Sequence, residues 1–203
     1  MDLFGNLADK NKNLLPVDGV ARYFGRVFGY EAATAHLQSL IAEVPWQQDE
    51  VVMFGKRIIT KRKVAWYGGN GLAYTYSGTT RQALPWSPDL LQLKTRVEAE
   101  TGESYNACLL NLYHNGEEGM SWHSDDEDTI VEGSAIASVS FGAPRRFLFK
   151  HRQSGQKVAL QLEHGSLLLM QGQTQQHWLH SLPKQRRETR PRVNLTFRKM
   201  KEK

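Results

Sequence analysis

From residue 106 onward the chain is a succession of short segments with the composition of β-strands, and this pattern limits the possible folds more than any other feature. The segments are rich in β-branched, aromatic and aliphatic residues, and Gly, Asn and Ser separate them. They cover residues 106–114, 135–142, 145–151, 157–172 and 191–199. Because helical patterns precede them, we expect an α+β fold with a β-barrel or sandwich core that carries helices on one side.

Helical patterns occur twice ahead of these strands. The first begins at Glu31, repeats apolar residues at helical spacing and ends before Pro45. The second has Ser87 as its N-cap and Pro88 in its first turn, and Gly102 stops it. The expected buried residues are Leu37, Leu40, Ile41 and Val44 in the first helix, and Leu90, Leu93 and Val97 in the second.

The domain organisation is expected to be simple. Residues 51–68 predict a hairpin or a pair of short strands. Residues 1–29 have weak periodicity and many turn formers, so we expect them to be poorly ordered or loosely draped, and we assign 1–30 to an N-terminal extension. Because no repeat, low-complexity stretch or clear linker follows, residues 31–203 are expected to form a single domain.

Composition excludes several classes of protein. The chain has 203 residues, of which 40% are hydrophobic, which suffices for one real core. Cys108 is its single cysteine, so no disulfide can form within the chain. No apolar run approaches the roughly 20 residues of a membrane span, and the first residues lack the pattern of a signal peptide. We therefore expect no membrane partner and a reducing compartment, the cytoplasm or, in a eukaryote, the nucleus.

Charge is distributed unevenly along the chain. Lys and Arg number 26 against 21 Asp and Glu, a formal net charge of +5, which permits a nucleic-acid partner without requiring one. The cations are scattered in small clusters, whereas acidic residues concentrate at 125–128. This contrast suggests a metal site inside a surface that binds polyanions.

Candidate metal ligands lie in two segments. His123 and Asp125 are separated by one residue, which on an extended chain places both side chains on the same face. The segment 175–185 offers His177 and His180 as a third ligand. Two histidines and one carboxylate form the facial triad that leaves open positions on non-haem Fe(II). The His-x-Asp tripeptide is weak by itself, since surface loops contain it by chance.

Alternation in the last strand segment separates an apolar face from a polar face. The polar face carries Arg192, Asn194, Thr196 and Arg198. Periodicity alone favours a solvated outer face for these residues. If the face instead lines a barrel mouth, its two arginines could hold the two ends of a small dicarboxylate, because arginine captures carboxylates in bidentate fashion. Two further candidates for the same ligand share one face of 106–114, namely Asn111 and Tyr113.

These motifs together resemble the AlkB family of Fe(II)- and 2-oxoglutarate-dependent dioxygenases. The resemblance rests on His123-x-Asp125, the distant His180, and the runs GLAYTYSG, AIASVSFGA, HGSLLLM, HWLHSLP and PRVNLTFRK, and it extends from about Asp49 to Lys199. It is strongest to the DNA-repair members, including the animal homologue that prefers double-stranded DNA. It implies a double-stranded β-helix (jelly-roll) core with supporting helices, and a nucleotide-recognition hairpin region at 49–86.

The resemblance also implies a role for each motif residue. His123, Asp125 and His180 would hold Fe(II), and His177 would not. The residues that would bind 2-oxoglutarate are Asn111, Tyr113, Arg192, Thr196 and Arg198, with Asn194 nearby. Those that would contact substrate are Phe54, Gly55, Lys56, Tyr74, Tyr76, Asp126 and Glu127. Phe54 would fill the gap that an extruded base leaves, Tyr76 would stack on that base, and the basic run from Lys56 to Lys63 would contact phosphates.

The function that follows from the resemblance is oxidative repair of alkylated DNA. The enzyme would use O2 and 2-oxoglutarate to demethylate bases such as 1-methyladenine and 3-methylcytosine, with release of formaldehyde. Its expected partner is duplex DNA, with single-stranded DNA and RNA also open, and we expect a monomer. Two alternatives remain at this point: a 2-oxoglutarate oxygenase that acts on RNA or protein, and a catalytically silent DNA-binding module.

Overall fold

The computed structural model describes residues 9–53, 56–69, 72–76 and 79–201, without the side chains of 49–53, 56–58, 73–76 and 79–81. In chain order the elements are β1 (Val20–Arg26), α1 (Tyr30–Glu43), β2 (Gln47–Met53), β3 (Lys56–Gly68), β4 (Ala73–Tyr76), β5 (Thr79–Gln82), α2 (Pro88–Thr101), β6 (Ala107–Tyr113), β7 (Met120–His123), β8 (Ile136–Gly142), β9 (Arg145–His151), β10 (Lys157–Leu162), β11 (Ser166–Gln171), α3 (Thr174–His177), β12 (Trp178–Leu182) and β13 (Arg192–Arg198).

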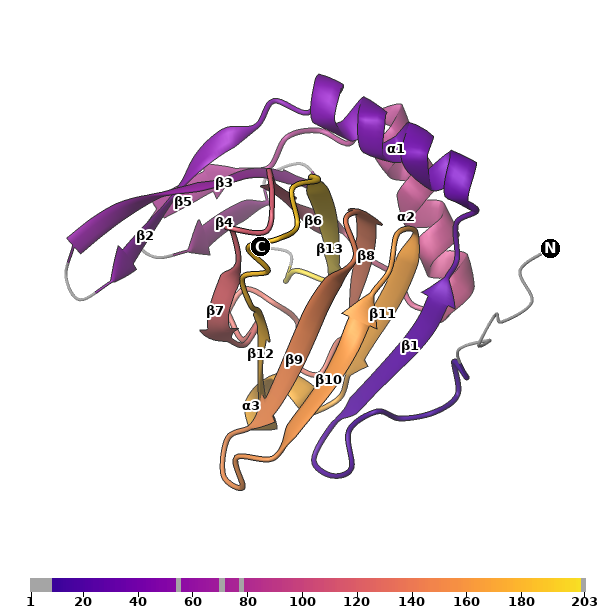
Figure 1. The fold of residues 1–203 in the computed structure, drawn as a ribbon, viewed down its shortest axis with the longest axis vertical. Helices are drawn as coiled ribbons and strands as arrows, with labels where there is room; N and C mark the ends of the chain where they lie inside the picture. The colour runs from indigo at the N-terminus through magenta and orange to yellow at the C-terminus, as the bar shows by residue number, and fades with distance from the viewer. Residues whose placement is uncertain (1–8, 54–55, 70–71, 77–78, 202–203) are drawn as a thin grey trace.

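Most of the strands form two antiparallel sheets (Figure 1). The larger has the order β1-β11-β8-β13-β6-β3-β2, and the smaller has the order β10-β9-β12-β7. Strands β4 and β5 pair with each other as a separate hairpin. The prediction of an α+β protein with a jelly-roll core and supporting helices is confirmed.

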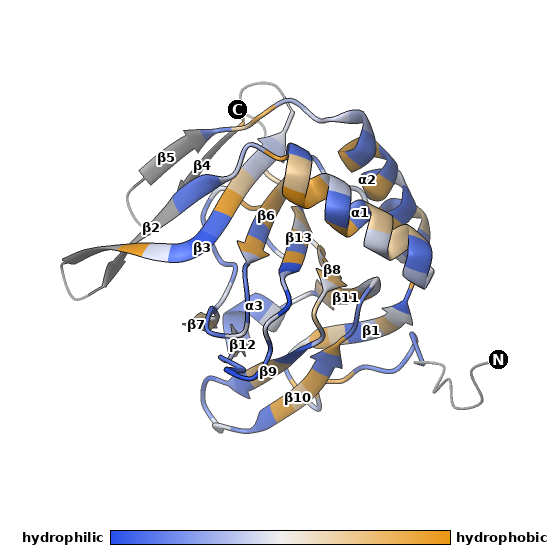
Figure 2. Ribbon diagram, turned by 45° about the horizontal axis from the view of Figure 1, so that its top comes forward, coloured by the Kyte–Doolittle hydropathy of each residue, from blue (hydrophilic) through white to orange (hydrophobic). Residues whose placement is uncertain are grey.

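Both predicted helices are present, and the signals that predicted α2 act as expected. The Ser87 side chain accepts a hydrogen bond from the backbone N–H of Leu90 at 3.3 Å. Gly102 closes the helix at φ 73°, a left-handed conformation that costs glycine little. Figure 2 shows hydrophobic and hydrophilic residues interleaved along α1 and α2, as expected for helices with one buried face.

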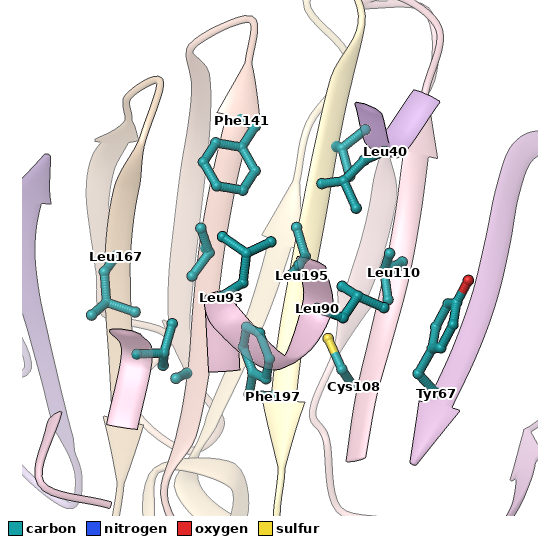
Figure 3. Close-up of a cluster of buried hydrophobic side chains, with 14 of the residues drawn as sticks. Leu40, Tyr67, Leu90, Leu93, Cys108, Leu110, Phe141, Leu167, Leu195 and Phe197 are labelled. Carbon is teal, nitrogen blue, oxygen red and sulfur yellow. The ribbon is translucent and has the colours of Figure 1, made fainter. Parts of the chain in front are cut away.

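The main core lies between these helices and one face of the larger sheet. Leu40 of α1 and Leu90 and Leu93 of α2 pack towards Leu110 and Leu195 of the sheet (Figure 3). A second cluster fills part of the space between the two sheets. It contains Ile136, Phe149, Leu162, Leu168 and Trp178. The larger sheet is therefore covered on both faces, which explains why every residue of β13 is buried.

The expected strands are present, and residues 51–68 contribute to a hairpin whose second strand, β3, is longer than expected. The expectation that residues 1–29 lie loosely is wrong for 20–26, because these residues form β1 and pair with β11 at the edge of the larger sheet. The backbone N–H of Val20 also donates to the Thr174 hydroxyl at 2.9 Å, which anchors the start of β1. The domain boundary at residue 31 stays a prediction. Within the described residues no helix is long and apolar enough to span a membrane.

Candidate functional site

A pocket opens between the two sheets and collects most of the predicted site residues. The larger sheet contributes the polar face of β13 together with residues of β6, β8 and β11, and the smaller sheet contributes residues of β7, β9 and β12. Of the predicted residues, those that line the pocket are Asn111, Tyr113, His123, Asp125, Glu127, His180, Arg192, Asn194, Thr196 and Arg198. The polar face of β13 thus lines a pocket and is not a solvated outer face.

His123, Asp125 and His180 form what we call the metal cluster. Each offers one ligand atom, and these atoms all lie within 4.8 Å of one another. Strand pairing brings the histidines together, because His180 of β12 lies directly opposite His123 of β7. Asp125 follows two residues after His123, as the spacing predicts.

The two imidazoles have nitrogens available for a metal ion. The Nδ1 of His123 lies 2.8 Å from the carbonyl oxygen of Ser121, which can only accept, so Nδ1 carries the proton and Nε2 keeps its lone pair. The Nδ1 of His180 is buried and has no hydrogen-bond partner among the described residues. Burial, with a smaller contribution from His123, lowers the pKa of His180 to about 3, so this ring is neutral at pH 7.

The carboxylate of Asp125 is held ionised. Burial alone would raise its pKa, but the Arg198 guanidinium, 2.8 Å away, together with the two histidines keeps the pKa below its ordinary value. The cluster thus offers a buried nitrogen of His180, a free lone pair on His123 and an anionic oxygen of Asp125. Donors of these types bind divalent metals. The cluster therefore fits an Fe(II) ion.

A glutamine that the sequence did not single out positions Asp125. The backbone N–H of Asp125 donates to Oε1 of Gln175 at 2.9 Å, and Gln175 lies in α3, five residues before His180. Its neighbour Gln176 donates instead to Glu132 at the surface. Gln175 thus joins the segments that supply two of the three ligands. No sequence signal marked it.

The predicted co-substrate residues form a continuous polar patch, because β13 pairs in register with β6. Arg192 lies opposite Tyr113, and Asn194 lies opposite Asn111. The Arg192 guanidinium is 5.4 Å from the centre of the Tyr113 ring and donates to Ser140 at 2.9 Å. Burial lowers the pKa of Arg192 to about 10, so it remains a cation at neutral pH.

Serine side chains complete this patch. Asn194 donates to the Ser138 hydroxyl at 2.8 Å and accepts from Thr196 at 3.2 Å. Ser138 lines the pocket, and Ser138 and Ser140 share one face of β8. The alternation in AIASVSFG was the signal that could have identified both serines.

The two predicted arginines differ in their surroundings. Arg192 lies in the polar patch, whereas Arg198 contacts the carboxylate of Asp125 and lies 3.5 Å from that of Glu127. Arg198, on the same face of β13 as Arg192, is therefore tied to the metal cluster. Glu127 faces the pocket, but Asp126 is largely exposed and lies beside Arg152.

The predicted substrate region is described only in part. Phe54 and Gly55 lie outside the described residues. Lys56 falls in β3, and Tyr74 and Tyr76 fall in β4, but their side chains are outside the description.

The prediction that the basic run from Lys56 to Lys63 contacts phosphates does not hold for Arg62, because its side chain is buried. It is 5% exposed, lines the pocket and lies 2.6 Å from the sulfur of Met120.

Arg145 was also missed. It is buried, and its guanidinium donates to the backbone carbonyls of Glu118 and Pro183. It thereby anchors the segments that flank β7 and β12, the two strands that supply the histidines of the metal cluster. Neither the sequence RR at 145–146 nor its spacing distinguished this residue from a surface arginine.

Comparison with known proteins agrees with this geometry. The family model of the 2OG-Fe(II) oxygenase superfamily matches residues 20–198. The protein named DNA oxidative demethylase ALKBH2 from Bos taurus is 44% identical over 86% of this chain and 66% of its own length. The protein of the same name from Mus musculus is 42% identical over 97% of this chain and 87% of its own length. The solved structure of OsALKBH1 aligns with a TM-score of 0.64 at 16% identity, covering 91% of this chain and 99% of that one, which supports the fold.

Proposed function

The chain belongs to the 2OG-Fe(II) oxygenase superfamily, and from that premise we propose that it is an oxidative DNA demethylase that repairs N-alkylated bases. The observation that carries the proposal is the metal cluster, placed in one pocket with the Arg192 patch. Two relatives that match most of this chain are named DNA oxidative demethylases, which supports DNA as the substrate.

Each part of the pocket has one task in this proposal. His123, Asp125 and His180 hold Fe(II), and the patch around Arg192 binds 2-oxoglutarate as a dicarboxylate. When bound, iron and 2-oxoglutarate supply the O2-dependent hydroxylation of the N-alkyl group, with succinate and CO2 as co-products. The hydroxymethylated base then releases formaldehyde and is restored.

The residues that bind 2-oxoglutarate are those of the patch and its neighbours. They are Asn111, Tyr113, Arg192, Asn194, Thr196 and Arg198. Arg192 is the anchor for one carboxylate, because it is buried, cationic and close to Tyr113.

Access of the base to the pocket requires that the nucleotide leaves the duplex, which costs a few kcal/mol. We propose that Phe54, with Gly55 and Lys56, occupies the vacated space and offsets part of this cost. Tyr74 and Tyr76 would stack against the extruded base. The hairpin of β2 and β3, which extends from the edge of the larger sheet, is suited to such a role (Figure 1).

Acidic residues favour an alkylated base that carries a positive charge. Glu127 supports this part of the proposal, because its side chain lines the pocket beside Arg198. The matching role of Asp126 stays a prediction, since its side chain is largely exposed beside Arg152.

The test is formaldehyde release from oligonucleotides that contain 1-methyladenine or 3-methylcytosine. We expect formaldehyde release to require both Fe(II) and 2-oxoglutarate. We expect His123→Ala to lower the activity by at least about 100-fold, because even the loss of a residue that only supports a metal ligand can lower activity by about that factor. His114→Ala is the matched control, because His114 lies outside the pocket, where it pairs with Glu118. Release unaffected by His123→Ala would contradict the metal assignment.

A comparison of substrates distinguishes the proposal from the two alternatives, an oxygenase that acts on RNA or protein and a silent DNA-binding module. Methylated duplex DNA, single-stranded DNA, RNA and peptide are compared under the same conditions. Turnover of RNA or peptide without DNA would contradict the proposal in favour of another 2-oxoglutarate oxygenase. DNA binding without succinate production would indicate a silent binding module.

The proposed role of Phe54 has its own test. Phe54→Ala is expected to reduce turnover of duplex DNA more than that of single strands, because only the duplex must be opened. Equal losses on both substrates would assign Phe54 to packing. The monomeric state and the cytoplasmic or nuclear location stay predictions, for light scattering and cell imaging respectively.

A further inference from the structure

His177, the alternative ligand of the sequence analysis, lies in a different cluster. It ends α3, while His151 ends β9 and Asp18 lies in the loop before β1. One candidate ligand atom from each of these three residues lies within 4.8 Å of the other two. None of the three lines the pocket. We call Asp18, His151 and His177 the second cluster, and the proposed function gives it no role.

The second cluster is built on segments that are held in place. The Nε2 of His151 lies 3.2 Å from Oδ2 of Asp18, and His151 is 3% exposed. The ring of His177 is nearly parallel to that of His151, with 6.3 Å between their centres. The loop that carries Asp18 is anchored by Trp178, whose indole N–H donates to the carbonyl of Val17 at 3.0 Å. The three candidate ligand atoms, all within 4.8 Å of one another, are therefore carried by anchored segments.

The geometry points to a second divalent-metal site, in which Asp18, His151 and His177 bind an ion of the zinc class. Two imidazole nitrogens and one carboxylate oxygen are ligands that zinc accepts in tetrahedral sites. Because Asp18 is half exposed, solvent can supply the fourth ligand. This inference goes beyond the proposed function, and it does not depend on it.

The ring of His151 can change tautomer when a metal binds. In the structure Nδ1 of His151 accepts from the backbone N–H of Ser154 at 3.1 Å, so Nε2 carries the proton and donates it to Asp18. A metal at Nε2 replaces that proton, and Nδ1 takes one up, so a neutral ring loses no proton in total. The Ser154 hydroxyl, 3.0 Å from Nδ1, then accepts from it, which gives the ligand the outer partner that metal-bound histidines have. The N–H···Nδ1 bond is the contact that is lost.

An ion in this site joins three segments that are distant in the chain. These are the loop before β1, the end of β9 and the end of α3. Because α3 leads directly into β12, which carries His180, the ion stiffens the support of the metal cluster without touching the pocket. Its effect is therefore expected on stability and metal stoichiometry and not on substrate contacts.

The experiment titrates the metal-free full chain with Zn²⁺ in competition with a chromophoric chelator. We expect about two equivalents for the unchanged protein, and about one each for His177→Ala and His123→Ala, because each variant removes a ligand from a different cluster. The double variant should retain no tight site. Gln176→Ala is the matched control on the same short helix and should keep both equivalents, since its side chain faces Glu132.

Further measurements make each outcome decisive. Circular dichroism of the metal-free variants must show an unchanged fold, and Asp18→Asn, in an exposed position, repeats the test if His177→Ala does not fold. Zn²⁺ should also raise the melting temperature of His123→Ala but not that of His123→Ala/His177→Ala. A single equivalent in the unchanged protein, or two in His177→Ala, would overturn the inference. Failure to demethylate DNA would leave this result untouched, so the two proposals fail separately.

Discussion

Arg198 shows how the surroundings of a single residue set its energetic role. Its guanidinium is 3% exposed and lies 2.8 Å from the buried carboxylate of Asp125. At the surface, Arg190 makes a contact of the same length to Glu188. Equal distances do not imply equal contributions, because removal of one partner from a buried pair leaves the other charge without compensation.

Truncation of the two arginines should therefore have different effects. We expect Arg198→Ala to lower the free energy of unfolding of the metal-free protein by about 3–5 kcal/mol, and Arg190→Ala by less than about 1 kcal/mol. Urea denaturation monitored by tryptophan fluorescence measures both. Similar losses in the two variants would show that burial does not govern the Asp125 pair.

Gln175 allows a second comparison at the scale of one residue. Removal of its side chain takes away the acceptor for the N–H of Asp125, so we expect Gln175→Ala to weaken Co²⁺ binding at the metal cluster by about tenfold. Gln176→Ala removes an equal number of atoms from the same helix and should leave the affinity unchanged. Absorption spectra of the Co²⁺ complex report the metal cluster when all variants are made in the His177→Ala background, which removes a ligand of the second cluster. An unaltered affinity in Gln175→Ala would limit this residue to packing.

Among the elements, β13 shows how neighbouring strands position a site residue. It pairs with β8 on one side and β6 on the other, and all seven of its residues are buried. The start of β13 is tightly constrained. Arg192 pairs with Gly142 of β8, which has φ 95°. A Cβ added at Gly142 would overlap the carbonyl oxygen of Pro191. The placement of Arg192 therefore depends on a glycine in the opposite strand.

Gly142→Ala should accordingly destabilise the protein by about 1–3 kcal/mol, because strain and overlap act together. Gly133→Ala is the control, since Gly133 also has a positive φ, 68°, but a Cβ there meets open space. The control should cost less, about 1 kcal/mol. Thermal and urea unfolding of both variants distinguish backbone strain from steric overlap, and equal losses would exclude a steric role for Pro191.

For the molecule as a whole, burial of histidines couples stability to pH. Burial lowers the pKa of His36 and of His164 below the ordinary 6.5. His164 also accepts the backbone N–H of Gly142 at 2.8 Å, which requires an unprotonated Nδ1. Below the ordinary pKa the unfolded chain therefore binds protons that the folded chain does not.

The sign of the pH dependence follows from this difference. The unfolding free energy of the metal-free protein should decrease as the pH falls from 7 to 5, and the slope should become smaller in His164→Gln. Chemical denaturation at several pH values gives the slope. His114→Gln, the same substitution at a more exposed histidine, is the control. A slope that His164→Gln leaves intact would contradict the contribution of this residue.

Local chemistry was sufficient to predict much of the fold. Ser87 and Gly102 determined the ends of α2, and alternation defined the two faces of β13, because capping and the period of two act over a few residues. The same locality explains what was missed: β1 follows a turn-rich stretch, and β7 has only four residues. Their pairing is decided by partners distant in the chain.

The sequence by itself supplied the candidates for the metal ligands and for the patch around Arg192, because its motifs carry the resemblance to a known family. Only the tertiary structure decided that the polar face of β13 lines a pocket, that Gln175 holds Asp125, and that His177 joins Asp18 and His151. Each of these depends on which segments meet across the two sheets. Burial of a face depends on what covers it, and no local pattern contains that information.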